Sequence, residues 1–143
     1  MPASMPCAVM HVMAGLLRDA DGRVLLAQRP PGKHLAGMWE FPGGKREPGE
    51  TPLAALAREL REELGVTLQH AEPLVALPWN YGGHELLLDA WRVEAWIGEP
   101  RPLEGQALQW QLPALVDMAI LTPADRPILQ TLIEACSAAA SGR

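Results

Sequence analysis

The segment from Gly44 to Val66 constrains this chain more than any other part of its 143 residues. It passes from a loop rich in glycine and proline into a segment of strong helix formers. Thr51 is a favourable N-cap, Pro52 suits the first helical turn, and Gly65 suits the left-handed residue that ends many helices. We therefore expect a helix over residues 52–64 that follows a glycine-rich loop.

The charged residues of this segment gather on one side of the expected helix. Successive residues are turned by about 100°, so the aliphatic side chains share the other side. The expected buried residues are Leu53, Leu56, Ala57, Leu60 and Leu64. The charged side holds Arg58, Glu59, Glu62 and Glu63, with Glu50 in the loop before them. Clustered carboxylates suit a hard divalent cation such as Mg²⁺, which prefers oxygen ligands, although many amphipathic helices carry a charged face that is merely solvated.

The spacing favours the metal-binding interpretation, because the segment resembles the Nudix box, Gly-x5-Glu-x7-Arg-Glu-U-x-Glu-Glu-x-Gly-U, where U is aliphatic. Every fixed position is present: Gly44, Glu50, Arg58, Glu59, Leu60, Glu62, Glu63, Gly65 and Val66. In this arrangement we expect Arg58 to orient Glu50 and the other carboxylates, since a bidentate guanidinium fixes a carboxylate well. Its alternative role is to bind a phosphate.

Segments outside the box are similar to the MutT subfamily of Nudix hydrolases, the 8-oxo-dGTP diphosphatases, across about residues 8–133. The matching segments are residues 26–30, 37–45, 98–100, 104–106, Trp110 and residues 123–127. The resemblance implies hydrolysis of a nucleoside triphosphate to the monophosphate and pyrophosphate, as in enzymes that sanitise the nucleotide pool and so protect DNA replication. It implies Mg²⁺ as the cofactor, with Mn²⁺ as a substitute.

The resemblance also implies roles for single acidic residues. Glu59, Glu62 and Glu63 are candidates for metal ligands and for the general base. We expect Glu63 to be a direct ligand, with the carbonyl of Gly43 beside it. Glu59 is the preferred base and Glu104, from a later loop, is the alternative.

Substrate binding is expected from the segments around the box. The residues implied are Arg29, His34, Glu40, Phe41, Pro42, Gly43 and Asp125. Phe41, Trp79 and Tyr81 are candidates to stack on a base, but aromatic residues between apolar runs are often part of a core. No functional role is indicated for His11, His70, Cys7 or Cys136.

Asp125 departs from the subfamily pattern, in which Asn is common at this position. An ionised Asp only accepts hydrogen bonds, so it would face the O6 acceptor of 8-oxoguanine unfavourably. Protonation of Asp125 or backbone donors would remove that conflict, and the N4 amine of cytosine would donate to the carboxylate directly. CTP or a modified dCTP is therefore the alternative substrate, and a nucleoside diphosphate linked to another group is a further one. The simplest alternative role for Asp125 itself is structural, because a negative charge near the start of a helix favours the helix dipole.

Composition narrows the remaining function classes. The net charge of −5 argues against binding to a nucleic acid polymer, which needs a basic surface. No segment of about 20 apolar residues and no signal peptide is recognised, so we expect a cytoplasmic protein without a membrane partner. The two cysteines form no CxxC motif, and we expect both to be free buried thiols. A non-catalytic Nudix-fold binding module would have lost box carboxylates, and none is lost. Whether the chain is a monomer or a dimer stays open.

The rest of the sequence predicts one α/β domain over residues 1–143, with its core at about 7–136. The resemblance implies the Nudix α/β/α sandwich, with a mixed β-sheet between helices. In the first half of the chain we expect a hairpin of strands 7–17 and 24–27. After the box we expect strand-like apolar runs over 66–79 that are broken by Pro73 and Pro78, then strands 85–96 and 107–112. The chain should end with one or two helical turns at 113–118, a helix over 123–139 capped by Thr122, and a frayed tail at 137–143.

Overall fold

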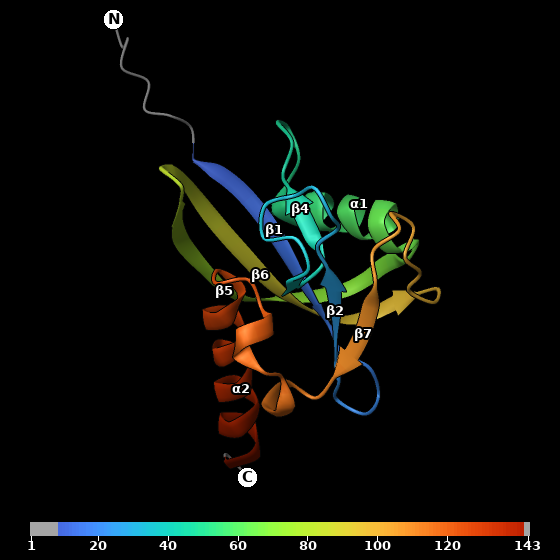
Figure 1. Cartoon of the computed structure of the whole chain (residues 1–143). Helices are drawn as coiled ribbons and strands as arrows, with labels where there is room; N and C mark the ends of the chain where they lie inside the picture. The colour runs from blue at the N-terminus through green and yellow to red at the C-terminus, as the bar shows by residue number, and fades with distance from the viewer. Residues whose placement is uncertain (1–8, 142–143) are drawn as a thin grey trace, which may run out of the picture.

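The structure is a computed structural model that describes residues 9–141, and side chains as far as residue 138. Two helices and two β-sheets make up this part of the chain (Figure 1). The strands are β1 (Met10–Leu17), β2 (Val24–Gln28), β3 (Trp39–Glu40), β4 (Gly43–Lys45), β5 (Thr67–Tyr81), β6 (His84–Ile97) and β7 (Leu108–Gln111). The helices are α1 (Pro52–Leu64) and α2 (Asp125–Ser141), with 3-10 turns η2 (Pro113–Leu115) and η3 (Met118–Ile120).

The larger sheet is mixed and has the order β4-β1-β6-β5, in which β1 and β6 run parallel and the other neighbours are antiparallel. Helix α1 covers one of its faces and α2 the other (Figure 1). All residues from Met13 to Leu17 are buried, because alternate side chains of this central strand face the two helices. The predicted α/β/α sandwich with a mixed sheet between helices is confirmed. Neither helix in the described range has the length and apolar character that crossing a membrane requires.

Helix α1 begins and ends where the sequence predicts. The Thr51 side chain accepts a hydrogen bond from the Ala54 amide, and Gly65 has the left-handed φ of 73° that ends the helix. Leu56, Leu60 and Leu64 are fully buried. Leu53 was wrongly placed in the core: it is 44% exposed, because the first turn extends beyond the part of the helix that packs on the sheet, where Ala55 is the first buried residue.

The predicted hairpin of the first two strands is wrong. The turn itself forms, with the Gly22 amide bonded to the Asp19 carbonyl, but only the bridge between Arg18 and Val24 joins the two strands. Strand β1 then lies between β4 and β6, while β2 lies between β3 and β7 in a second, antiparallel sheet. Each of the two strands has both of its hydrogen-bonding edges paired with other strands, so neither has an edge left to pair with the other.

The prolines of the segment after α1 do not break it. β5 runs without interruption through Pro73 and Pro78, with irregular pairing to β6 around Leu68–Ala71 and Pro73–Val75. It is an edge strand, where a missing N–H that faces away from the neighbouring strand costs no ladder hydrogen bond. The predicted strands 85–96 and 107–112 correspond to β6 and β7.

The C-terminal helix begins at Asp125, two residues later than predicted, because Pro123 and Ala124 form a turn. The Thr122 amide donates to the Trp39 carbonyl, so this turn is attached to β3. The helix continues to Ser141, so residues 137–141 are helical rather than frayed. Cys136 is free and half-buried against the core, whereas the predictions for Cys7 and for residues 142–143 lie outside the described residues.

Candidate active site

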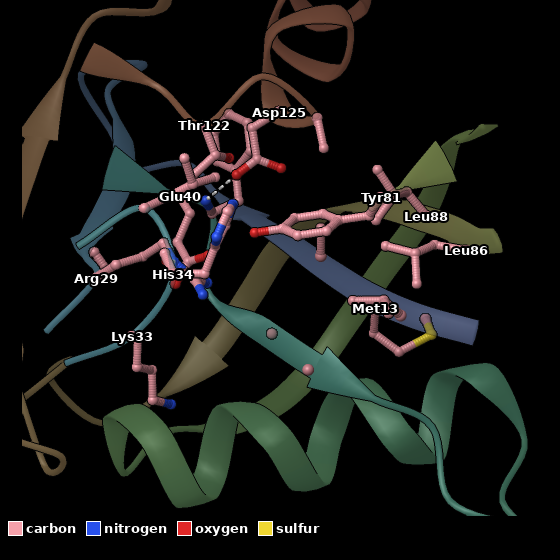
Figure 2. Close-up of a pocket in the computed structure, with 18 of the residues that line it drawn as sticks. Met13, Arg29, Lys33, His34, Glu40, Tyr81, Leu86, Leu88, Thr122 and Asp125 are labelled. Carbon is pink, nitrogen blue, oxygen red and sulfur yellow. Dashed lines mark hydrogen bonds and ion pairs between the residues drawn. The ribbon is translucent and has the colours of Figure 1, made fainter. Parts of the chain in front are cut away.

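A cavity of about 870 Å³ lies between α1 and the start of α2, with lining residues from both sheets (Figure 2). It brings together most of the residues singled out from the sequence. Those that line it are Arg29, His34, Glu40, Phe41, Gly43, Gly44, Glu59, Glu63, Glu104 and Asp125. Pro42, Arg58 and Glu62 do not line it, and neither do the remaining box residues Glu50, Leu60, Gly65 and Val66.

Carboxylates crowd the end of the cavity nearest α1. Glu63 is only 8% exposed, and one of its oxygens accepts a hydrogen bond of 3.2 Å from the Gly43 amide. Burial, reinforced by the nearby charges of Glu104, Glu40 and Glu59, raises the pKa of Glu63 to about 8. Burial also raises the pKa of Glu59, against the opposing effect of a hydrogen bond from Arg58. This end of the site therefore holds more buried negative charge than its protein neighbours balance.

Two glycines allow these carboxylates to approach β4. A Cβ at Gly44 would lie 2.5 Å from a carboxylate oxygen of Glu59, well inside contact distance. A Cβ at Gly43 would overlap the carbonyl of Met13 on the neighbouring strand β1. At Gly43 a side chain would meet the backbone of β1, so glycine is required there, whereas a side chain at Gly44 would displace the Glu59 carboxylate from its place beside β4.

Arg58 lies at the centre of a network behind the carboxylates. Its Nε and Nη2 donate to the two oxygens of Glu50, at 2.6 and 2.9 Å. Its Nη1 donates to Glu59 at 3.0 Å and to Glu62 at 3.3 Å, and Nη2 also donates to the Lys45 carbonyl. The hydrogen bonds from Arg58 and from the Glu47 amide lower the pKa of Glu50 to about 2. The geometry is that expected of an arginine that orients carboxylates. Glu62, whose side chain is 55% exposed, lies outside the cavity lining.

The opposite end of the cavity is also polar. Arg29 forms an ion pair of 2.9 Å with Glu40, and its Nε donates to the His34 carbonyl at 2.6 Å. Burial raises the pKa of Glu40, against the opposing effect of Arg29. The His34 ring contacts the edge of Tyr81, with 4.8 Å between ring centroids (Figure 2). The positive charge of Arg29 is thus partly neutralised by Glu40, a contact that the sequence did not indicate.

Asp125 is a buried residue that lines the end of the cavity opposite the α1 carboxylates. It is 7% exposed, and its Oδ2 accepts a hydrogen bond of 3.1 Å from the Phe41 amide. Burial raises its pKa to about 7, and hydrogen bonds from Phe41 and Thr122 only partly oppose that effect. Figure 2 shows Asp125, Thr122 and Glu40 grouped together. A carboxyl group in this state changes protonation near neutral pH, and so can act as a donor or as an acceptor.

Residues 13–131 match the family model described as a NUDIX domain. The chain belongs to the Nudix family. It is 35% identical over 123 residues to an 8-oxo-dGTP diphosphatase of Escherichia coli strain K12, and the aligned residues cover 86% of this chain and 95% of that relative. It is 40% identical over 125 residues to a CTP pyrophosphohydrolase of the same strain, covering 87% and 92%. The solution structure of the E. coli ORF135 protein matches with a TM-score of 0.82 and 39% identity, covering 91% of this chain and 92% of that one.

Two residues of this Nudix site were missed by sequence reasoning. Gln106 is buried, donates to the Glu63 carbonyl at 3.2 Å and accepts from the Glu104 amide at 3.0 Å, so it attaches the Glu104 loop to the end of α1. Its place two residues after Glu104 in a matching segment was an available signal. Lys33 also lines the cavity, and its side chain extends toward the α1 side (Figure 2). Its loop position alone did not distinguish it from a solvated lysine.

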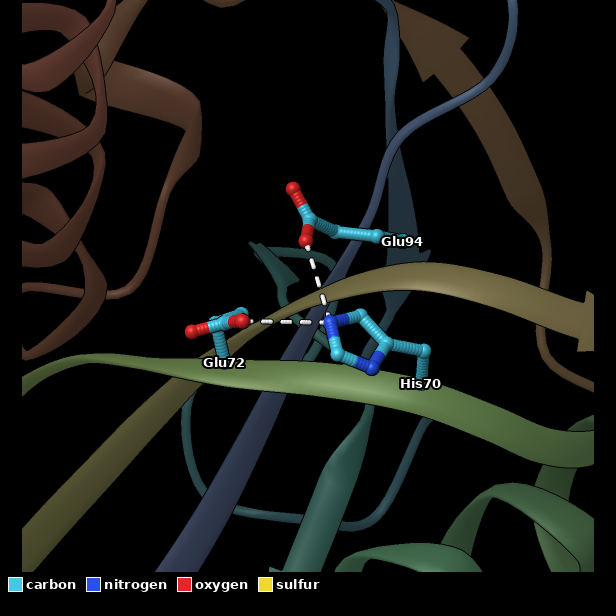
Figure 3. Close-up of side chains that lie close together, drawn as sticks. All are labelled: His70, Glu72 and Glu94. Atoms are coloured by element: carbon cyan, nitrogen blue, oxygen red, sulfur yellow. Dashed lines mark hydrogen bonds and ion pairs between the residues drawn. The ribbon is translucent and has the colours of Figure 1, made fainter.

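A second group of ligand-type side chains lies apart from the Nudix helix (Figure 3). His70 Nε2 is 3.1 Å from a carboxylate oxygen of Glu72 and 3.6 Å from one of Glu94. The three residues are exposed on β5 and β6, and none lines the cavity. His70 thus forms a surface ion-pair cluster, of the kind that contributes little to stability.

Proposed function

We propose that this Nudix hydrolase converts nucleoside triphosphates to nucleoside monophosphates and pyrophosphate, with 8-oxo-dGTP as the preferred substrate. One observation carries the proposal: a single cavity has carboxylates at its α1 end and a buried polar wall at the other. The first end suits a phosphate chain with its cation, and the second suits a base that is recognised by hydrogen bonds. Glu59, Glu63 and Glu104 form the first, and Glu40 and Asp125 belong to the second.

A divalent cation fits the α1 end because the available donors are carboxylate oxygens that lack a balancing positive charge. Glu63 is the proposed ligand from the cavity, together with the Gly43 carbonyl, and Glu62 is the ligand candidate held by Arg58. Glu59 becomes a further ligand only if Glu104 serves as the base. Mg²⁺ is the proposed ion and Mn²⁺ its substitute. When bound, the cation would offset charge on the phosphate oxygens and stabilise the departing monophosphate.

The remaining chemistry is assigned to side chains of α1. Glu59 is the proposed base, which takes the proton of the water that attacks the β-phosphorus. Its Oε2 is held by Arg58, so Oε1 is the oxygen proposed to take that proton. Glu104 is the alternative base, on a loop that Gln106 attaches to α1.

Base recognition is assigned to the second end of the cavity. Oδ2 of Asp125 accepts from the Phe41 amide, Thr122 also bonds this carboxyl group, and Oδ1 is the proposed contact with the substrate. A protonated Asp125 would donate to the O6 of 8-oxoguanine, which removes the conflict between two acceptors. Phe41 and Trp79 pack with the core cluster while also lining the cavity, and Tyr81 contacts His34, so Tyr81 is the stacking candidate with the fewest core contacts.

A cytidine triphosphate is the second candidate, and two observations favour it. Ionised Asp125 offers an acceptor that the cytosine N4 amine matches directly, and a relative named CTP pyrophosphohydrolase is 40% identical over 125 residues. The two substrates therefore demand opposite protonation states of the same residue.

The deciding experiment is a turnover screen of the wild-type protein with Mg²⁺ against 8-oxo-dGTP, dGTP, CTP, dCTP and 5-methyl-dCTP, with the products separated by chromatography. We expect monophosphate and pyrophosphate, and the highest kcat/KM for 8-oxo-dGTP. A higher kcat/KM for a cytidine nucleotide would select the second candidate. Binding without turnover of any nucleotide would identify a non-catalytic module, and release of single orthophosphates would contradict a diphosphatase.

A further inference from the structure

His11 joins the central sheet to the loop of the Nudix box, although it lies outside the cavity. Its Nε2 is 2.8 Å from Oδ2 of Asp89 on β6, the strand parallel to β1. Its Nδ1 accepts a hydrogen bond of 3.1 Å from Nε of Arg46, the residue that follows β4. The His11 and Asp89 side chains are only 17% and 14% exposed, which separates this pair from the exposed surface cluster of His70.

The two contacts determine the protonation of the His11 ring. An arginine side chain only donates hydrogen bonds, so Nδ1 must present its lone pair to Arg46. The ring proton is therefore on Nε2, from which it is donated to Asp89. The other oxygen of Asp89 accepts from Nε1 of Trp91 at 2.8 Å. His11 is thus a neutral imidazole in a single tautomer, since a proton on Nδ1 would place two N–H groups against each other.

Arg46 passes this constraint to the loop before α1. Its Nη1 donates to the Glu50 carbonyl at 2.7 Å, while its own amide donates to the His11 carbonyl at 2.8 Å. The backbone bond fixes where the loop leaves β4, and the side-chain bond fixes the loop again at Glu50. The Glu50 carboxylate then holds Arg58, which in turn holds Glu59.

We propose that His11 is a positioning residue of the Nudix site, which as a neutral imidazole fixes Arg46 against Glu50 and thereby the loop that orients Arg58 and Glu59. The activity part of this inference rests on the proposed function. His11 does not line the cavity, so its loss should lower kcat and leave the KM for the nucleotide unchanged. The effect of one hydrogen bond in such a network is about three- to tenfold in kcat.

The test compares kcat and KM of wild type, His11→Phe, Arg46→Leu and the double variant, with His70→Phe as the matched control. We expect both single variants to lose kcat at unchanged KM, and the double variant to lose no more than the worse single one, because both act through one contact. His11→Asn keeps an acceptor near the position of Nδ1 and should recover part of the loss. His70→Phe should behave as wild type. Wild-type kcat in folded His11→Phe, or additive losses in the double variant, would overturn the proposal.

Two measurements that need no enzymatic activity test the proposed protonation of His11 and its effect on the loop. Long-range ¹H–¹⁵N spectra of the wild-type protein at neutral pH should show the His11 proton on Nε2 and a lone pair on Nδ1; a proton on Nδ1 would overturn the inference even if every variant failed to fold. Amide exchange should be faster at Glu47, whose N–H donates to the Glu50 carboxylate, in His11→Phe than in His70→Phe; equal rates would contradict the proposal. If the wild type hydrolyses no nucleotide, the proposed function fails while these two results still stand.

Discussion

Arg58 donates two parallel hydrogen bonds to Glu50, from Nε to Oε2 at 2.6 Å and from Nη2 to Oε1 at 2.9 Å. The two residues lie eight positions apart, in the loop and on the helix that follows it. Their paired geometry leaves Nη1 free to hold Glu59 and Glu62. One planar guanidinium thus connects the loop to the carboxylates of the cavity, a function that requires several donors in a fixed arrangement.

Arg58→Lys should therefore lower kcat although it preserves the charge. A lysine has one ammonium group and cannot hold Glu50 in a fork while it also bonds Glu59. We expect a loss of about 10- to 100-fold in kcat, the range usual for residues that orient metal ligands. Steady-state kinetics with saturating Mg²⁺ measure the effect. Arg61→Lys, an exposed change on the same helix, is the control and should have no effect.

Glu63→Gln and Glu59→Gln should separate the metal ligand from the base. Glu63→Gln removes a charged oxygen at constant shape, so the Mg²⁺ concentration needed for half-maximal rate should rise at least about tenfold. Glu59→Gln should lower kcat by about 10²- to 10⁴-fold, the usual contribution of a general base. Mg²⁺ titrations of activity distinguish the two effects. An unchanged Mg²⁺ requirement in Glu63→Gln would remove Glu63 from the ligand set, and unchanged kcat in Glu59→Gln would transfer the role of base to Glu104.

The position of water attack can be read from the products. Attack at the β-phosphorus places the oxygen of water in pyrophosphate, whereas attack at the α-phosphorus places it in the nucleoside monophosphate. We expect hydrolysis in ¹⁸O-water to label pyrophosphate, as determined by mass spectrometry of both products. Label in the monophosphate would show that water attacks the α-phosphorus instead.

The local elements of the fold were predictable, but their partners were not. Thr51, Pro52 and Gly65 fix the bounds of α1 by capping rules that act within a few residues. The pairing of β1 depends on β4 and β6, which lie far from it in sequence, so a favourable turn at residues 19–22 predicted the wrong neighbour. Likewise, the prolines of β5 become acceptable only because that strand lies at the edge of the sheet.

The residues of the site also fall into those that the sequence predicted and those that it did not. The carboxylates of α1 and their arginine followed from spacing on one helix and from the match to the box. Lys33 and Gln106 did not, because a loop lysine and a buried glutamine acquire their neighbours only through tertiary packing. The ion pair of Arg29 with Glu40 likewise joins β3 to the end of β2, which sequence spacing alone does not bring together.

Lys33→Met should raise the KM for nucleoside triphosphates and leave kcat nearly unchanged. Lys33 extends from its loop toward the α1 side of the cavity, where the phosphate chain is expected (Figure 2). A lysine binds phosphate as a point charge, and an exposed contact of this kind contributes about 1 kcal/mol, or roughly a fivefold change in KM. Arg61→Met removes an equal charge outside the cavity and is the control. Equal KM values for both variants would show that only the net charge matters.

The last prediction concerns the protonation of Asp125. Its pKa is raised to about 7 by burial, so near neutral pH it changes from donor to acceptor. Below that pH, protonated Asp125 donates to the O6 of 8-oxoguanine; above it, ionised Asp125 accepts from the N4 amine of cytosine. For the wild type, the ratio of kcat/KM for 8-oxo-dGTP to that for CTP should therefore fall as pH rises from about 6 to about 8.

Asp125→Asn should remove this pH dependence, because an amide carries a donor and an acceptor at every pH. It should keep or improve turnover of 8-oxo-dGTP and weaken any activity on CTP. The variant also has a stability signature. The native carboxyl binds its proton more tightly than the unfolded chain does, so the contribution of Asp125 to stability falls as pH rises from about 4 to about 7, by at most roughly 4 kcal/mol. Asp125→Asn should therefore be more stable than wild type at pH 8, with the difference vanishing near pH 4.

Kinetics across pH and thermal unfolding test the two parts of this prediction separately. Asn still offers an oxygen to the Phe41 amide, so the variant should retain the contact between α2 and the segment after β3. A stability difference at pH 8 without any change in nucleotide selectivity would mean that Asp125 is a buried acid that does not touch the base. An unchanged selectivity ratio across pH in the wild type would exclude the protonation argument for both substrates, because each depends on the same carboxyl group.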